Sequence, residues 1–170
     1  MKNNFLLFSF LVFLQIFVLN KILFFKYIVL APFILVLLLY RYKKDSKENL
    51  IVGFLIGLFI DIFNDSLGVY SLTSIVLVYF RNLWVLKIIG QDKTDELSLL
   101  SIRELGRIQF LFYSSPIVLL FFILLSFLKS SNFLNIDNLL TIILSTIVNI
   151  IFMIIFQYLF LKSNFKNEWR

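Results

Sequence analysis

The sequence predicts an all-α integral membrane protein, a bundle of six transmembrane helices that forms a single domain over residues 1–170. Two observations carry this prediction. Hydrophobic residues make up 61% of the 170 residues, and the mean hydropathy is +0.96. A soluble domain of this size needs far more polar residues to cover its surface. The apolar residues also fall into blocks of about the length, roughly 20 residues, that crosses about 30 Å of hydrocarbon as a helix.

Six such blocks can be placed along the chain. The run from Phe5 to Tyr40 would be roughly 54 Å long as one helix, at about 1.5 Å per residue, so it must turn back. Asn20–Lys21 and Lys26 are alternative positions for this turn, and Pro32 is expected to bend the second helix. An amphipathic segment on the inner membrane surface is expected at about 95–106. The predicted helices cover about residues 5–20, 26–40, 50–63, 69–89, 108–128 and 139–161.

Two residue types are missing from the sequence, which has no cysteine and no histidine. Disulfides, thiol catalysis, Ser–His and Cys–His chemistry, and histidine ligation of zinc or haem are therefore excluded. We predict no catalytic residue, no metal ligand and no cofactor. The apolar N-terminal block is not followed by a small-x-small cleavage site, so we expect a retained first helix and not a secretion signal.

The distribution of charge predicts the orientation. With the N-terminus inside, thirteen of the 16 lysines and arginines lie on the inner side, and only Lys21, Lys26 and Lys129 lie outside. The positive-inside rule favours this arrangement. Anionic lipid headgroups account for the same basic residues, so the net charge of +6 does not indicate nucleic-acid binding. Arg81 and Lys87 fall in the inner half of the fourth helix, where we expect their side chains to snorkel towards water.

Gly53, Gly57 and Asp61 form the most informative pattern, a glycine stripe with a spacing of four residues. On a helix these positions share one face. Two small residues at this spacing let a second helix backbone approach closely, and we favour packing within the chain over a partner interface. The turn that follows, from Asn64 to Gly68, combines helix-capping side chains with a glycine that is free to adopt a positive φ.

Asp61 has three interpretations, because a carboxylate inside a membrane segment is costly unless it is paired, hydrated or protonated. It can cap the turn in the wet interface, anchor the hairpin through internal hydrogen bonds, or handle a ligand or a proton. We favour the anchor. The glycine stripe directs Asp61 towards protein, and the side chains of Asn64 and Ser66 lie within a few residues, as do the free N–H groups of the next helix.

The stretch from Gly53 to Gly68 resembles the rod shape-determining membrane protein family MreD. That family shows G-x-x-x-G-L-x-x-D, a short polar turn, and then L-G before a helix. The segment from Phe80 to Ile89 resembles one branch of the same family, and the rest of the chain matches it in hydropathy and layout only. More loosely, the glycines and Asp61 resemble the substrate-binding subunits of energy-coupling-factor transporters. The candidate structural or partner-contact residues are Gly53, Gly57, Asp61, Asn64, Gly68 and Arg81.

The resemblance implies a non-enzymatic scaffold of the cell-elongation machinery in the bacterial plasma membrane, with both termini cytoplasmic. Its implied partners are an MreC-like membrane-anchored protein and, through it, a RodA-like glycosyltransferase with its transpeptidase. One rival is a small-molecule-binding subunit of a transporter, for which a short glycine-bearing segment ending in Asp61 is typical. The other rival is an aspartyl intramembrane peptidase. It needs two carboxylates that share a proton, whereas Asp61 and Asp65 are adjacent on one helix turn and Asp137 lies in an outer loop.

The charge distribution gives a testable topology. Reporter fusions placed after Lys47 and after Lys129 are expected to lie in opposite compartments, the first cytoplasmic and the second outside. Paired alkaline phosphatase and green fluorescent protein reporters at both positions measure this. The same compartment at both positions would contradict the six-helix topology.

Overall fold

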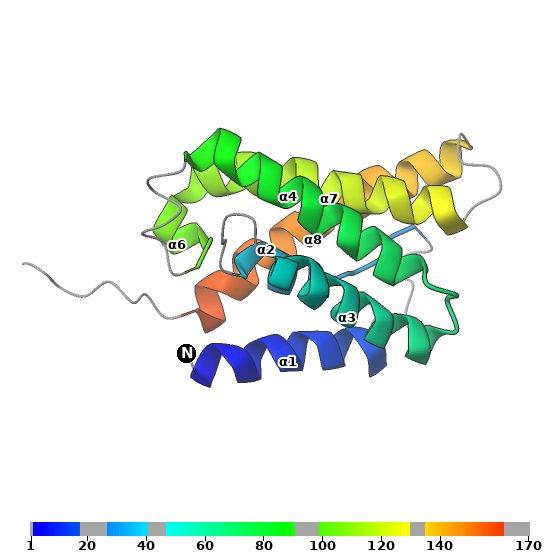
Figure 1. Ribbon diagram of the computed structural model, residues 1–170. Coiled ribbons are helices and arrows are strands. Elements are labelled where there is room, and N and C mark those ends of the chain that lie inside the picture. Colours follow the sequence, from blue (N-terminus) through cyan, green and yellow to red (C-terminus); the bar gives the residue numbers. More distant parts are fainter. Residues whose placement is uncertain (1, 18–26, 41–46, 91–98, 130–134, 162–170) are drawn as a thin grey trace, which may run out of the picture.

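The computed structural model describes residues 2–17, 27–40, 47–90, 99–129 and 135–161, and the regular elements in this part of the chain are all helices. The long helices run back and forth along one common direction, with a short helix, α2, in the middle (Figure 1). The helices are α1 (Lys2–Phe17), α2 (Phe33–Leu39), α3 (Lys47–Asn64), α4 (Val69–Ile89), α6 (Ile102–Leu105), α7 (Arg107–Lys129) and α8 (Ile136–Phe160).

Three of the described helices, α4, α7 and α8, are long and apolar enough to cross a membrane by length and composition. The predicted bundle of six spanning helices is therefore not supported as six helices of full length. Helix α3 has 18 residues but carries Lys47, Glu48 and Asp61, and α2 has only seven residues. The structure supports a helical fold in which α4, α7 and α8 are candidates for crossing a membrane.

The second predicted helix, at about 26–40, is wrong in its first half. Residues 27–32 are not helical, and α2 begins only at Phe33. Pro32 explains the break, because it lacks an N–H group and disfavours helical backbone at the preceding residue, Ala31. Every residue of α2 is buried. The segment is thus a central element, enclosed by the other helices, with polar backbone groups at both ends that need partners.

Helix α8 supplies partners for the non-helical segment. The Ser145 hydroxyl accepts a hydrogen bond from the Val29 N–H at 2.9 Å. The Asn149 amide accepts one from the Ala31 N–H at 2.7 Å and donates one to the Val29 carbonyl at 2.8 Å. Asn149 therefore pairs with the extended backbone as a neighbouring strand would. From α1, the buried Gln15 amide donates to the Leu30 carbonyl at 3.3 Å.

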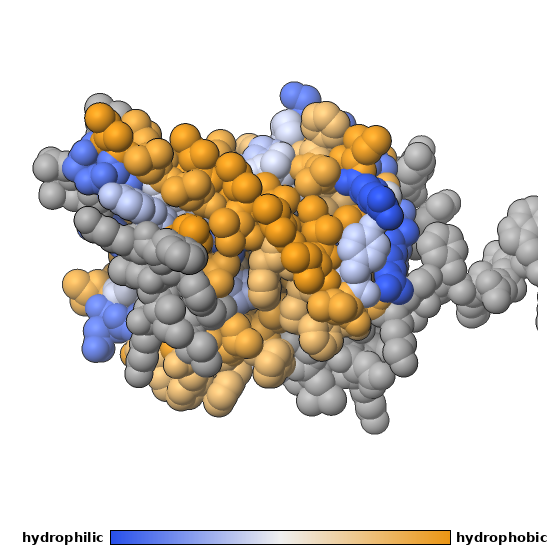
Figure 2. All heavy atoms as spheres, turned by 180° about the vertical axis from the view of Figure 1, so that it is seen from behind, coloured by the Kyte–Doolittle hydropathy of each residue, from blue (hydrophilic) through white to orange (hydrophobic). Residues whose placement is uncertain are grey.

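The surface of α8 shows the inverse of the pattern found in a soluble helix. Its polar side chains Ser145, Asn149 and Gln157 are completely buried, and we call them the α8 polar row. Four isoleucines spaced by four residues are about half exposed: Ile143, Ile147, Ile151 and Ile155. Figure 2 shows a broad hydrophobic surface across the middle of the molecule, with hydrophilic residues mainly towards its ends. Such a surface is suited to lipid and not to water.

The remaining boundaries differ little from the prediction. Helix α4 covers 69–89 as predicted, and α3, α7 and α8 begin earlier than predicted by one to three residues. Of the amphipathic segment at 95–106, only Ile102–Leu105 is helical among the described residues, and the Gln157 amide oxygen accepts the Ile102 N–H at 2.8 Å. The alternative turn positions at residues 20–21 and 26 lie outside the described residues.

Replacement of Asn149 by leucine should destabilise the fold, because it removes the partners of the buried Ala31 N–H and of the partly buried Val29 carbonyl. The expected loss is about 2 kcal/mol or more in the free energy of unfolding, at about 1–3 kcal/mol for each unpaired group. Thr146→Val is the matched control, since the described hydrogen bond of the Thr146 hydroxyl goes to the Ile142 carbonyl of its own helix. Unfolding in mixed detergent micelles measures both variants, and equal losses would contradict this role of Asn149.

Candidate functional site

Asp61 joins the end of α3 to the beginning of α4. Its side chain is buried, with 8% of its surface exposed. One carboxylate oxygen accepts the Tyr70 N–H at 2.9 Å and the Ser66 hydroxyl at 2.5 Å, and the other accepts the Ser71 N–H at 2.7 Å. These amides belong to the first turn of α4, which has no partners for them within the helix. The negative charge also lies at the positive end of the α4 dipole.

Two of the glycines predicted to form a packing surface contact α4 directly. A Cβ atom built on Gly57 would lie 2.5 Å from both the Ser71 Cα atom and the Tyr70 carbonyl oxygen, which are backbone atoms. A Cβ atom on Gly53 would lie 2.8 Å from the Val78 side chain. The glycine stripe therefore packs within the chain, as expected, and the closest approach of α3 to α4 depends on Gly57.

The turn between α3 and α4 is narrow and conformationally unusual. Gly68 is the N-cap of α4 and has φ +86°, as its predicted role requires. Asp65 and Leu67 also have positive φ values, of 49° and 34°, which is uncommon for residues with a side chain. Asn64 ends α3 and is half-buried. The described hydrogen bonds bring Ser66 to the Asp61 carboxylate, and they do not bring Asn64 there.

Arg81 is completely buried, so the expectation that it snorkels towards water is wrong. It lies on the face of α4 that packs towards the end of α2 and towards α7. Its Nε atom donates to the Tyr113 hydroxyl at 2.9 Å, and its Nη2 atom donates to the carbonyls of Leu38, at 3.3 Å, and Tyr40. The Tyr113 hydroxyl donates in turn to the Leu38 carbonyl at 2.9 Å. Lys87, by contrast, is exposed.

The arginine cluster (Arg81, Tyr113 and the Leu38 and Tyr40 carbonyls) satisfies the carbonyl groups at the C-terminal end of α2. The last carbonyls of a helix have no donors within the helix and carry its negative partial charge. A buried guanidinium costs several kcal/mol unless its donors are satisfied. Among the described residues, carbonyl and hydroxyl oxygens satisfy it, with no carboxylate in a salt bridge. The carbonyls at the end of α2 therefore accept the guanidinium donors of Arg81, and Arg81 in turn supplies the donors that these carbonyls lack within the helix.

Asp61 and Arg81 do not form one site. Asp61 bonds residues 70 and 71, whereas Arg81 lies ten residues further along α4, a distance of about 15 Å at about 1.5 Å per residue. In both clusters the polar atoms are occupied by backbone and hydroxyl partners. No group of three or more potential metal ligands occurs in the described part of the chain. Asp61 and Arg81 are thus two separate internal anchors, one for the start of α4 and one for the end of α2.

Sequence reasoning missed the α8 polar row and Tyr113. The signal for the polar row was present, because Ser145 and Asn149 interrupt one of the most apolar helices at a spacing of four residues. Polar residues inside such a helix face the protein interior and find partners there. Tyr113 carried no comparable signal, since tyrosine is also common at membrane interfaces.

The α3–α4 contact predicts a difference between two alanine variants. Gly57→Ala should cost about 1–3 kcal/mol of stability, because its methyl group meets backbone that cannot rotate away. Gly53→Ala is the matched control and should cost less, since it meets the Val78 side chain. Thermal unfolding in mild detergent compares the two, with Gly57→Leu as the more severe variant. Equal stability of Gly57→Leu and the wild type would contradict the packing described above.

Comparison of the chain with protein-family models, with curated proteins and with solved structures gave no match. The resemblance to MreD therefore rests on the residues from Gly53 to Ile89 themselves. Their geometry is the basis on which a function can be proposed.

Proposed function

We propose that this chain is a non-enzymatic membrane scaffold of the bacterial cell-elongation machinery, similar in role to MreD. It crosses the plasma membrane six times, and both termini are cytoplasmic. The non-helical segment before α2, residues 27–32, is part of the second crossing. The observation that carries the proposal is that the glycine stripe packs directly against α4 and that Asp61 bonds the first turn of α4. The G-x-x-x-G-L-x-x-D pattern that resembles MreD is the same set of residues that holds α3 against α4.

The distribution of polar groups supports a scaffold. Asp61, Arg81 and the α8 polar row are all buried and bond groups within the chain. The outer faces of the helices are apolar and rich in phenylalanine. On α1 and α3, for example, the ring centres of Phe17 and Phe63 lie 5.7 Å apart. A partner in the membrane, such as an MreC-like protein, would bind such faces by close packing. A RodA-like glycosyltransferase and its transpeptidase would then join through that partner.

The peptidase alternative is weakened by the geometry of Asp61. Both of its carboxylate oxygens accept hydrogen bonds from backbone N–H groups of α4. Asp65 is exposed at the turn. A catalytic pair needs two carboxylates close enough to share a proton, and the described hydrogen bonds of Asp61 instead serve the start of α4.

The transporter alternative gains one specific observation. A pocket of about 430 Å³ lies between α7 and α8, beside the non-helical segment 27–32, whose Val29 contributes to the lining. Ser126, Lys129, Asn138 and Thr141 are polar residues in its lining. Binding sites in transporters commonly adjoin interrupted helices, and the volume falls within the usual range for small ligands, about 300–1,000 Å³. A small-molecule-binding subunit is therefore the second candidate.

Affinity purification of the tagged full chain in mild detergent tests the scaffold, with recovery of an MreC-like protein as the expected result. Asp61→Asn and Asp61→Leu sharpen the test in a depletion strain. Asparagine keeps one acceptor oxygen, which can serve the Tyr70 N–H, whereas its NH2 group faces the Ser71 N–H, so it should preserve part of the partner recovery and rod shape. Leucine removes the acceptor, at about 1–3 kcal/mol for each unpaired group, and should lose both.

Immunoblots of the membrane fraction control for protein level. If Asp61→Asn accumulates normally but is as inactive as Asp61→Leu, the charge itself is required and the scaffold loses support. Absence of any MreC-like protein from the wild-type eluate would contradict the scaffold directly. Stabilisation of the purified chain by a small metabolite in the same detergent would favour the transporter candidate.

A further inference from the structure

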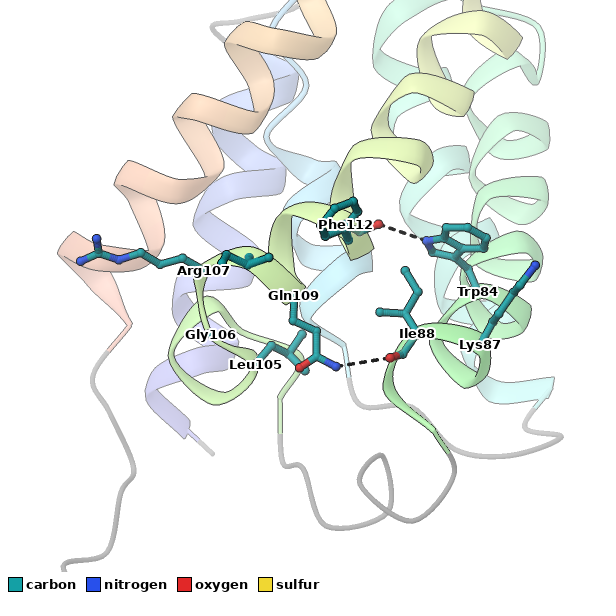
Figure 3. A pocket seen from close by; sticks show the side chains of 9 residues that line it. Trp84, Lys87, Ile88, Leu105, Gly106, Arg107, Gln109 and Phe112 are labelled. Atoms are coloured by element: carbon teal, nitrogen blue, oxygen red, sulfur yellow. Dashed lines mark hydrogen bonds between the residues drawn. The ribbon is translucent and has the colours of Figure 1, made fainter.

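A groove lies at the end of the molecule opposite the Asp61 turn, where α4 ends and α7 begins. It has a volume of about 960 Å³. Figure 3 shows it between the last turns of α4 and the first turns of α7, with α6 beside it. Its walls are mainly apolar and consist of Trp84, Ile88, Leu105, Ile108 and Phe112.

Two hydrogen bonds between helices hold the groove in shape. The Trp84 indole N–H donates to the Phe112 carbonyl at 3.3 Å. This carbonyl lacks its normal helical donor, because the residue four positions later is Pro116. The Gln109 amide donates to the Ile88 carbonyl at 3.3 Å, near the end of α4 (Figure 3). Both polar side chains are thereby engaged, and the Ile88 carbonyl already has the Gln109 amide as its partner.

The groups that remain for a ligand are positive. Lys87 is exposed and its Nζ atom lies 5.7 Å from the centre of the Trp84 ring. The first residues of α7 also line the groove, and their N–H groups precede the first helical hydrogen bond, from Phe110 to Gly106. A helix N-terminus carries positive partial charge. Arg107 borders the groove with its side chain directed away from it (Figure 3), and its Nε atom donates to the Tyr158 hydroxyl of α8 at 2.9 Å.

Among the residues that the structure describes, none of those lining the groove is acidic. The nearby acid of α6, Glu104, accepts a hydrogen bond from the Leu99 N–H at 3.1 Å. The groove thus combines a positive rim with apolar walls. Ile108 and Phe112 expose about 70% of their surfaces, so the walls continue onto the apolar outer surface of the helices. A ligand that matches both parts has an anionic head and a hydrocarbon tail.

We propose that this groove binds an anionic phospholipid, with its phosphate at Lys87 and the start of α7 and an acyl chain along Trp84, Ile108 and Phe112. Trp84 suits the boundary between headgroups and hydrocarbon, where tryptophan is enriched. Basic pockets between helices at this level bind the headgroups of anionic lipids. The site does not depend on the scaffold function, since it requires only that these helices lie in a bilayer.

Quenching of Trp84 fluorescence by brominated phospholipids tests the site. The sequence has two tryptophans, so Trp169→Phe leaves Trp84 as the only tryptophan, whose emission can be excited selectively over that of the tyrosines. The protein is reconstituted into vesicles with brominated phosphatidylglycerol or brominated phosphatidylcholine at equal mole fractions. Lys87→Gln removes the cation at the groove. Lys47→Gln is the matched control, with the same change of charge on an exposed lysine of α3 that does not line the groove.

The expected result is a binding constant at Trp84 about fivefold higher for phosphatidylglycerol than for phosphatidylcholine. A basic residue near the surface contributes about 1 kcal/mol to binding of anionic lipid, which corresponds to about a fivefold effect. Lys87→Gln should abolish the preference, and Lys47→Gln should retain it within about twofold.

Three results would overturn the proposal. Equal constants for the two lipids in the parent protein would show that the headgroup is not recognised. Equal losses in Lys87→Gln and Lys47→Gln would assign the preference to general attraction by the basic surface. If neither lipid quenches the fluorescence of Trp84, protein and not lipid fills the groove.

Discussion

The need to pair every backbone polar group without help from water is the constraint on which the rest of this structure depends. The chain between Tyr27 and Tyr40 breaks its helix at Pro32, and the break leaves amides and carbonyls unpaired at the centre of the fold. In an apolar environment each such group costs several kcal/mol. Asn149 satisfies one end of the segment and Arg81 the other, so α4 and α8 are tied to the same central element.

This constraint also explains why polar side chains lie inside and apolar ones outside. Ser145, Asn149, Arg81 and Tyr113 face inward and form hydrogen bonds with the backbone of other segments. Asp61 does the same for the first turn of α4. With these groups occupied, the outer helix faces are left to packing, with lipid or with a partner helix.

Much of the local structure could be predicted from the residues alone. Composition indicates a helical membrane protein, and the spacing of Gly53, Gly57 and Asp61 places them on one face towards another helix. The turn residues at Ser66 and Gly68 predict where α4 begins. These predictions succeed because each depends on neighbours within about ten residues, where helix periodicity and turn chemistry control the geometry.

The sequence by itself therefore determined the class of fold and the α3–α4 hairpin with its glycine contact. Only the tertiary structure decided which residues surround α2, because the partners of its backbone lie far away in the sequence. Asn149 lies 118 residues from Ala31, and Arg81 lies 43 residues from Leu38. The same reason accounts for the buried Arg81, which by position alone resembles a snorkelling residue. Helix periodicity specifies a face of a helix, but the backbone group that meets this face is fixed only when distant segments pack together.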